Sequence, residues 1–185
     1  MDNLIGKIAL VTGASRGCGK GIAKSLAEAG AMVYITGRTI SEGTSDSGLP
    51  GTIYQTAREI HDSGGKCIAL QCDHRDDDQV QGVFRTIHQR HQNIDILVNN
   101  AGITRDNILL RMKEDEWEDI IDTNLSSIYK MSKSVLRGMI KNRSGRIISI
   151  TSVVGAMGNA GQSNYAAAKA GMIGFTKSLA REVGV

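Results

Sequence analysis

Short apolar runs recur along the chain and alternate with stretches that have the spacing of amphipathic helices. The runs cover residues 7–12, 31–36, 66–71, 94–98 and 147–150. They are rich in Ile, Val and Leu, which is typical of strands buried on both faces of a parallel sheet. One intervening helix is marked by Val80, Val83, Phe84 and Ile87, which repeat at i, i+3, i+4 and i+7. The alternation predicts an α/β fold with a doubly wound parallel sheet.

Several predicted helices have recognisable ends. Gly30 is expected just after the first helix, because glycine accepts the left-handed conformation that follows many helices. Asp76 and Ser163 are expected to be N-caps, whose side-chain oxygens accept N–H groups of the first turn. A further helix is predicted from Thr52 to Ser63, and a long helical region from Glu114 to Asn142.

Length and composition narrow the range of functions. The 185 residues suffice for one domain, 1–185, with a sizeable core. A net charge of +3 without a block of Lys or Arg favours small anionic ligands over nucleic acid. The odd number of cysteines indicates reduced thiols in a cytoplasmic protein. The opening apolar run is too short for a membrane span, and the histidines lack the spacing of a metal site.

Glycines follow the first predicted strand in the order Gly13-Ala-Ser-Arg-Gly17-Cys-Gly19. A helix and a second strand come next, so the glycines lie inside a β-α-β unit. Glycine allows the backbone to approach a pyrophosphate closely, and the helix N-terminus favours its charge. A plain tight turn would also contain glycine, and the spacing differs from G-x-G-x-x-G. The strand–helix context nevertheless indicates a dinucleotide site.

Tyr165 and Lys169 lie four residues apart in the last predicted helix, on one helix face. An ammonium group near a phenol favours the phenolate, which suits a tyrosine to proton transfer near neutral pH. Ser152, at the end of the preceding strand, is expected to hydrogen-bond the same substrate oxygen. A buried tyrosine beside a lysine alkyl chain would give the same spacing, so the pair gains its weight from the glycine loop.

The carboxyl ends of the predicted strands should meet at one edge of the sheet, because crossovers are right-handed. The glycine loop, Asp73, Asn99 to Gly102 and Ser152 each follow a strand there. Ligands bind at this edge in doubly wound sheets, so these residues are expected to line one crevice.

The second predicted strand has Gly37-Arg38 at its tip, without the acidic residue that binds the ribose 2′-hydroxyl in NAD sites. Arg16 and Arg38 are expected to face a 2′-phosphate, which guanidinium groups bind well. Two ordinary surface arginines are the alternative. Glu42 follows in a long polar loop and is expected to be solvated. The sequence therefore predicts NADPH as the cofactor.

These motifs together resemble the short-chain dehydrogenase/reductase family, which has a Rossmann-type fold. The matching residues are Thr12-Gly-Ala-Ser-Arg-Gly-Cys-Gly19, Asn99-Asn-Ala-Gly102, Asn124, Ser152 and Tyr165-Ala-Ala-Ala-Lys169. Residues 95–183 are especially similar to 3-oxoacyl-[acyl-carrier-protein] reductases, through GITRDNILLRMK, NLSSIY and SVVGAMGNAGQSNYAAAKAG. Residues 1–94 resemble the family more generally, and the insertion at 39–51 departs from its compact members.

The resemblance implies roles for individual residues. Tyr165 would protonate a substrate carbonyl, and Lys169 would hold the nicotinamide ribose and tune Tyr165. Ser152 would steady the substrate oxygen, and Asn124, in a helix kink, would hold a water of a proton relay. Asp73 would meet the adenine, although a turn or capping role is the alternative. The implied cofactor-binding residues are Gly13, Ser15, Arg16, Gly17, Gly19, Arg38, Asp73, Asn100, Ala101, Gly102, Tyr165 and Lys169, with no metal.

The implied function is NADPH-dependent reduction of a carbonyl to a hydroxyl, on a 3-oxoacyl-[acyl-carrier-protein] in fatty acid synthesis. Arg143 matches a docking arginine for the acidic carrier; an ordinary solvated charge is the alternative. Reduction of another ketone or an acyl-CoA remains open, as does an inactive, cofactor-binding truncated protein.

Relatives continue beyond Val185, so the resemblance predicts a C-terminally truncated fold that lacks the family's last strands. An exposed sheet edge is expected beside the first half of the sheet. A homo-oligomer is expected through the two long helices. The apolar face expected on the second of these helices comprises Ala166, Ala170, Ile173, Leu179 and Val183.

Overall fold

A parallel five-stranded sheet organises the computed structural model, which describes residues 4–43 and 48–184. The strands are β1 (Ile8–Thr12), β2 (Met32–Gly37), β3 (Lys66–Gln71), β4 (Ile96–Asn99) and β5 (Arg146–Ser149). Their order is β3-β2-β1-β4-β5, so the winding reverses between β1 and β4. This arrangement confirms the predicted doubly wound α/β sheet, and such a reversal opens a crevice at the carboxyl ends of the strands.

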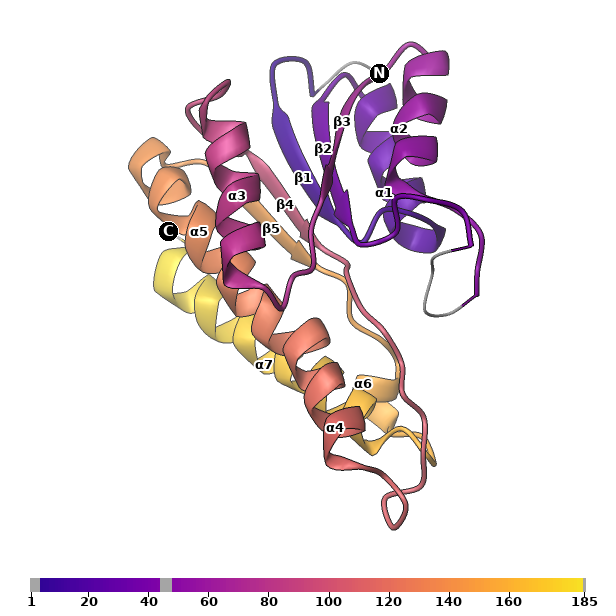
Figure 1. Ribbon diagram of the computed structural model, residues 1–185. Helices are drawn as coiled ribbons and strands as arrows, with labels where there is room; N and C mark the ends of the chain where they lie inside the picture. Colours follow the sequence, from indigo (N-terminus) through magenta and orange to yellow (C-terminus); the bar gives the residue numbers. More distant parts are fainter. Residues whose placement is uncertain (1–3, 44–47, 185) are drawn as a thin grey trace.

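Helices cover both faces of the sheet (Figure 1). They are α1 (Gly17–Glu28), α2 (Ile53–Asp62), α3 (Asp77–His88), α4 (Glu114–Ile121), α5 (Ser127–Asn142), α6 (Val154–Met157) and α7 (Ser163–Val183). A π-helical turn, η1 (Asp122–Ser126), joins α4 to α5. The helices α1 and α2 lie on one face, and α3 and α5 lie on the other. The N-terminal part of α7 packs against α4, η1 and α6.

Successive strand residues point to opposite faces of the sheet and contribute to two hydrophobic clusters. Ala9 and Val11 point toward α1 and α2, where they join Ala23 and Ile53 in one cluster. Leu10 points the other way, into the cluster of α3 and α5. Burial on both faces explains why these strands read as continuous apolar runs in the sequence.

Most predicted element ends are confirmed. The side chain of Asp76 accepts the N–H groups of Asp78 and Gln79 at 2.9 and 3.1 Å, and Gly30 follows α1 with φ of +95°. The prediction for Ser163 is wrong. The helix α7 begins at Ser163 itself, and the free N–H of Tyr165 is accepted by the side chain of Asn164 at 2.7 Å. Asn164 is buried and reaches this donor from inside the first turn.

The apolar face predicted for α7 was expected to pack against a second copy of the chain, so it remains a prediction. Within one chain, the buried residues of this helix are Asn164, Ala168, Lys169 and Met172, whereas Ala170 is exposed and Ile173 is only half-buried. The inner face carries two polar side chains because it borders the site described below.

The edges of the described sheet are β3 and β5. The exposed apolar edge lies at β5, where Ile148 is 46% exposed. A sheet edge was expected beside the first half of the sheet, where β3 is the edge strand, and a second edge lies at β5. Within residues 4–43 and 48–184, no helix has the length and apolarity needed to cross a membrane.

Candidate active site

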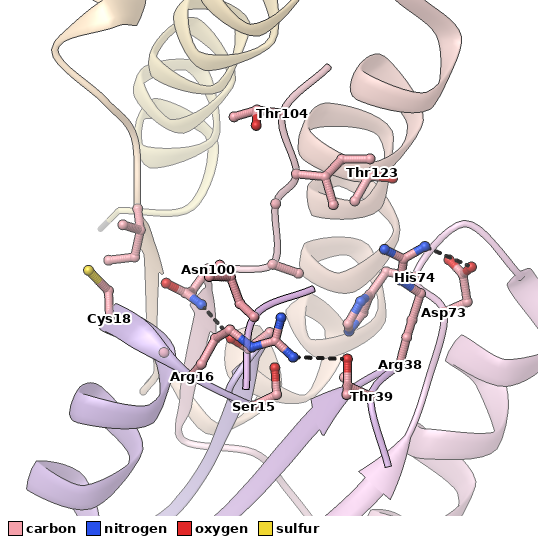
Figure 2. Close-up of a pocket in the computed structure, with 18 of the residues that line it drawn as sticks. Ser15, Arg16, Cys18, Arg38, Thr39, Asp73, His74, Asn100, Thr104 and Thr123 are labelled. Carbon is pink, nitrogen blue, oxygen red and sulfur yellow. Dashed lines mark hydrogen bonds and ion pairs between the residues drawn. The ribbon is translucent and has the colours of Figure 1, made fainter. Parts of the chain in front are cut away.

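A cavity of about 570 Å³ opens where the winding of the sheet reverses (Figure 2). Its walls come from the loops after β1, β2, β3 and β4, from Ile150 and Thr151 after β5, and from Tyr165 and Lys169 of α7. The strand ends therefore meet at one crevice, as predicted. Gly17 does not line it, but the other residues predicted to bind the cofactor do.

The loop after β1 lies directly against the loop after β4. Gly13 has φ of +67°, and a Cβ placed on it would lie 2.6 Å from Cα of Ala101. Thr12 joins the same two loops, since its hydroxyl oxygen accepts the N–H groups of Asn100 and Ala101 at 3.0 Å each. Sequence reasoning missed this role of Thr12. The feature that could have indicated it is a hydroxyl residue at the end of an apolar strand, directly before a glycine.

The N-terminus of α1 borders the cavity through Cys18 and Gly19. Within the described residues, no side chain caps this helix, so its first N–H groups are suited to an anion. Arg16 lies beside it and donates from Nη2 to Thr39 Oγ1 at 3.2 Å and to the Gly51 carbonyl at 2.9 Å. Glu42 is exposed, and it also accepts the Gly51 N–H at 3.3 Å.

The tip of β2 carries the second arginine. Arg38 Nη1 lies 4.0 Å from Asp73 Oδ2, and both side chains line the cavity (Figure 2). His74 lies beside them, fully buried, with Nε2 at 2.8 Å from Thr36 Oγ1. Burial lowers the pKa of His74 to about 4, so the imidazole is neutral at pH 7. Sequence reasoning missed His74, because its neighbours come from another strand.

Lys169 and Tyr165 lie together on the cavity wall, as their spacing predicted. Lys169 is only 4% exposed, and its Nζ donates to the Ile150 carbonyl at 2.8 Å. The same Nζ lies 5.7 Å from the centroid of the Tyr165 ring. Burial lowers the pKa of Lys169 to about 8, which leaves the ammonium form dominant at neutral pH. The site therefore holds a cation next to a phenol.

Ser152 is not among the residues that line the cavity, although its neighbour Thr151 is. The Ser152 hydroxyl accepts the N–H of Val154 at 3.2 Å, at the start of α6. This short helix was not predicted, because its residues fall in a glycine-containing stretch. The predicted contact of Ser152 with a substrate remains a prediction.

Asn124 lies in the π-helical turn, which agrees with the implied helix kink. Its side chain is fully buried and makes two bonds to Ile103, accepting the N–H at 2.8 Å and donating to the carbonyl at 2.9 Å. Both polar ends of the amide thus hold the loop after β4 against η1. The implied water contact of Asn124 remains a prediction.

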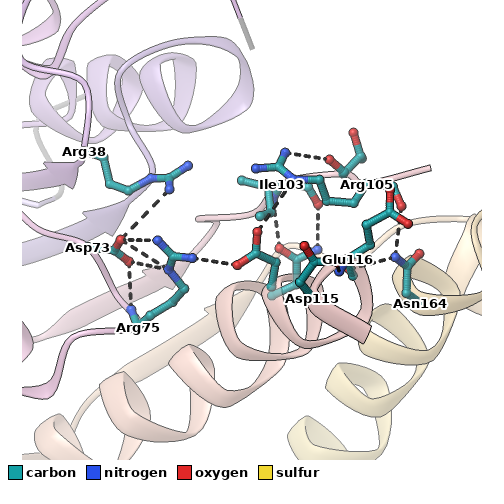
Figure 3. Close-up of polar contacts among 11 residues, drawn as sticks. Arg38, Asp73, Arg75, Ile103, Arg105, Asp115, Glu116 and Asn164 are labelled. Atoms are coloured by element: carbon teal, nitrogen blue, oxygen red, sulfur yellow. Dashed lines mark hydrogen bonds and ion pairs between the residues drawn. The ribbon is translucent and has the colours of Figure 1, made fainter. Parts of the chain in front are cut away.

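Asn164 holds the same loop from the other side (Figure 3). It is fully buried, and Nδ2 donates to the carbonyls of Arg105 and Glu116 at 3.0 and 3.1 Å. Its Oδ1 accepts the N–H of Tyr165. One side chain therefore connects the loop after β4, the helix α4 and the backbone of Tyr165. Sequence reasoning missed it, although it directly precedes the tyrosine.

Thr123 supplies a polar group suited to a ligand. It lines the cavity, and its buried hydroxyl has no hydrogen-bond partner among the described residues. Buried hydroxyls are normally satisfied, so a bound polar molecule or water is expected here. Residues 4–43 and 48–184 contain no group of three His, Cys, Asp or Glu side chains placed to hold a metal ion.

Comparison with known proteins agrees with this architecture. The chain is 57% identical over 181 residues to a 3-oxoacyl-[acyl-carrier-protein] reductase FabG from Vibrio cholerae, covering 98% of this chain and 69% of that protein. It is 54% identical over 181 residues to the FabG of Escherichia coli strain K12, with the same two coverages. These values confirm the resemblance to this group of reductases.

A solved structure of an actinorhodin polyketide ketoreductase with NADPH superimposes with a TM-score of 0.86 at 31% identity. The match covers 96% of this chain and 65% of the ketoreductase. The profile of the short chain dehydrogenase family matches residues 7–185. The chain therefore belongs to the short-chain dehydrogenase family.

Proposed function

We propose that this protein uses NADPH to reduce a carbonyl group to a hydroxyl, with a 3-oxoacyl group on acyl carrier protein as the substrate. The observation that carries the proposal is the pairing of Tyr165 with the buried ammonium of Lys169 on the wall of a cavity built for a dinucleotide. The relatives above 50% identity are named for this reaction.

The cavity fits the two ends of an NADPH molecule differently. The uncapped N-terminus of α1 and the close glycine loop suit the pyrophosphate. Arg16 and Arg38 lie at the end formed by β1 to β3 and would bind the 2′-phosphate, since guanidinium groups match phosphate geometry. Gly17, with φ of +56°, shapes the turn without lining the cavity. Asp73 would lie near the adenine.

Tyr165 would donate a proton to the substrate oxygen. The reduced nicotinamide supplies the hydride, so neither a metal nor a nucleophile is needed from the protein. Lys169 holds its positive charge near the Tyr165 ring and would also bind the nicotinamide ribose. Ser152 would hydrogen-bond the developing alkoxide, because a donor aimed at that oxygen stabilises the transition state. Asn124 would contribute to the proton relay while its side chain keeps the loop after β4 in place.

The carrier protein would dock near the C-terminal end of α5. Arg143 is exposed there, in the left-handed conformation that ends the helix, with φ of +51°. Arg143 precedes β5 and does not line the cavity. Carrier proteins are acidic, so this exposed cation would favour their approach. We expect Arg143→Glu to raise KM for carrier-bound substrate by about fivefold and to leave KM for a small acyl thioester unchanged.

The test is NADPH oxidation at 340 nm with three substrates: a 3-oxoacyl group on carrier protein, the same group on coenzyme A, and a simple ketone. We expect kcat/KM to be highest for the carrier-bound substrate, lower for the coenzyme A ester and lowest for the ketone. A ketone or the coenzyme A ester as the best substrate would replace the carrier assignment. Binding of NADPH without turnover of any of the three would contradict the proposed reaction.

We also propose a homo-oligomer and a cytoplasmic location. The helix α5 presents Tyr129 and Ile140 at the surface, each more than half exposed, and the outer face of α7 carries Ala170. A second copy packed on these two helices would bury them. Cys18, Cys67 and Cys72 are free thiols, which fits a reducing compartment. Light scattering of the purified protein tests the oligomer.

A further inference from the structure

Five charged side chains of alternating sign link the tip of β2 to the loop after β4 (Figure 3). They are Arg38, Asp73, Arg75, Asp119 and Arg105. The successive N–O distances are 4.0, 2.7, 2.7 and 3.7 Å. Arg75 is the central member and touches both carboxylates.

Asp73 places a negative charge beside an arginine that is expected to bind a phosphate. It lines the cavity next to Arg38, which would contact the 2′-phosphate. Hydrogen bonds from Arg75 hold the pKa of Asp73 below its ordinary value, so the carboxylate is ionised at neutral pH. A 2′-phosphate carries a charge of about −1.5 to −2 at pH 7. An uncompensated Asp73 would repel this group and would compete with it for Arg38.

Arg75 engages Asp73 far more closely than Arg38 does. Its Nε lies 3.1 and 3.2 Å from the two carboxylate oxygens, and its Nη2 donates to Oδ2 at 2.7 Å. The backbone N–H of Arg75 adds a bond to Oδ1 at 3.0 Å. This forked contact is the strong form of a charge-assisted hydrogen bond. Arg38, at 4.0 Å, makes only a loose ion pair with the same carboxylate.

Two further contacts fix Arg75 in this position. Lys130 of α5 donates to the backbone carbonyl of Arg75 at 3.0 Å, and Arg75 Nη1 donates to Asp119 at 2.7 Å. The guanidinium is thus held against Asp73 from the side of α4 and α5. Arg38 lines the cavity on the other side of Asp73.

We propose that Arg75 is a positioning residue for cofactor choice: by neutralising Asp73, it reduces the repulsion of a 2′-phosphate by this carboxylate and so favours NADPH over NADH. This inference rests on the proposed use of NADPH. Arg75 lies outside the glycine loop and the tip of β2, and it acts through Asp73 without touching the phosphate itself.

The test measures binding of two cofactor fragments by calorimetry, which needs no turnover. Adenosine 2′,5′-bisphosphate and adenosine 5′-monophosphate differ only in the 2′-phosphate. We expect the parent protein to prefer the bisphosphate, and Arg75→Gln to reduce that preference by about tenfold. Affinity for the monophosphate should change by less than about twofold. Thermal unfolding and circular dichroism establish that the variant is folded. Arg75→Lys is a second, more conservative variant, which should lose only part of the preference for the bisphosphate.

A double-mutant cycle isolates the neutralising role. In the Asp73→Asn background the negative charge is gone, so adding Arg75→Gln should leave the preference unchanged. The matched control is Asp119→Asn, which removes one contact that holds Arg75 but leaves the hydrogen bonds from Arg75 to Asp73. Because Asp73 stays neutralised, the preference should stay within about twofold of the parent.

Equal weakening of both fragments by Arg75→Gln would overturn the inference, because a general structural role acts on both. So would a loss of preference that persists in the Asp73→Asn background. A parent protein that does not prefer the bisphosphate would refute the NADPH assignment itself, which separates that failure from a failure of Arg75.

Discussion

The two ends of the cavity are held in place by different forces. At the catalytic end, Asn124 and Asn164 are fully buried neutral amides, and each bonds backbone groups of the loop after β4. At the cofactor end, Arg38, Asp73 and Arg75 are charged and partly exposed, and Asp73 forms ion pairs with both arginines.

This difference has physical consequences. A buried amide bonded to backbone carbonyls is insensitive to salt and costly to remove, because the carbonyls lose their donor. Partly exposed ion pairs are screened by salt and contribute little stability, but they are sensitive to the charge of a ligand. The catalytic end is thus built for fixed geometry, and the cofactor end for discrimination between anions.

Tyr165→Phe is expected to have the largest effect, because it removes the proposed proton donor at the catalytic end. Proton transfer by a positioned side chain contributes about 10²–10⁴-fold, so kcat should fall by about that factor. NADPH affinity, measured by fluorescence titration, should stay within about twofold, because the ring and Lys169 remain. Near-parental kcat on the best substrate would remove Tyr165 from the mechanism.

Asn164→Ala tests whether buried amides fix the catalytic end. The backbone carbonyls of Arg105 and Glu116 would lose this donor, and the buried Asn164 side chain would leave a gap, so the free energy of unfolding should fall by about 2–4 kcal/mol. We expect kcat to fall by about tenfold or more, since Tyr165 loses its anchored backbone. Urea unfolding and steady-state kinetics measure the two effects.

The matched control is Asn159→Ala, which changes an exposed amide bonded only to Gln162 among the described contacts. It should alter neither stability nor kcat appreciably. If Asn164→Ala behaves like this control, the catalytic end is not held by its buried amides and the comparison fails.

Sequence patterns predicted those functional residues whose contacts lie within a few positions along the chain. The glycine loop and the Tyr165–Lys169 pair were predicted because turn chemistry and helical spacing act within a few residues. Asn164 was missed because its partners Arg105 and Glu116 lie 59 and 48 residues away.

The same reasoning explains the error at the start of α7. Ser163 was expected to cap this helix, yet it lies within the first turn, and the buried side that faces the cavity carries Asn164 and Lys169. The π-helical turn around Asn124 was indicated only by the family resemblance. Sites are where the local rules of burial are most often broken.

His74 predicts how the cofactor end responds to acid. Its pKa is about 4 in the folded protein and about 6.5 when unfolded, so between these values only the unfolded chain binds the proton. The free energy of unfolding should therefore fall as the pH falls, by about 2 kcal/mol between pH 7 and pH 5. His74→Gln keeps a partner for Thr36 and should flatten this dependence in urea unfolding.

Exposed His88 supplies the matched control for that experiment. His88→Gln should leave the slope between pH 7 and pH 5 as it is in the parent. An unchanged slope in His74→Gln would mean that the imidazole is protonated within the fold.

Ionic strength gives the smallest effect and the most direct test of the comparison. Raising NaCl from about 0.05 to 0.5 M shortens the screening length from roughly 14 to 4 Å, which weakens attraction between Arg16, Arg38 and a 2′-phosphate. KM for NADPH should rise by about three- to tenfold, and KM for NADH by less than about twofold, because NADH lacks that phosphate. The buried amides at the catalytic end are unaffected by salt, so kcat at saturating NADPH should stay constant. A kcat that falls in step with the rise in KM would mean that the catalytic end also depends on exposed charges, and the distinction between the two ends would no longer hold.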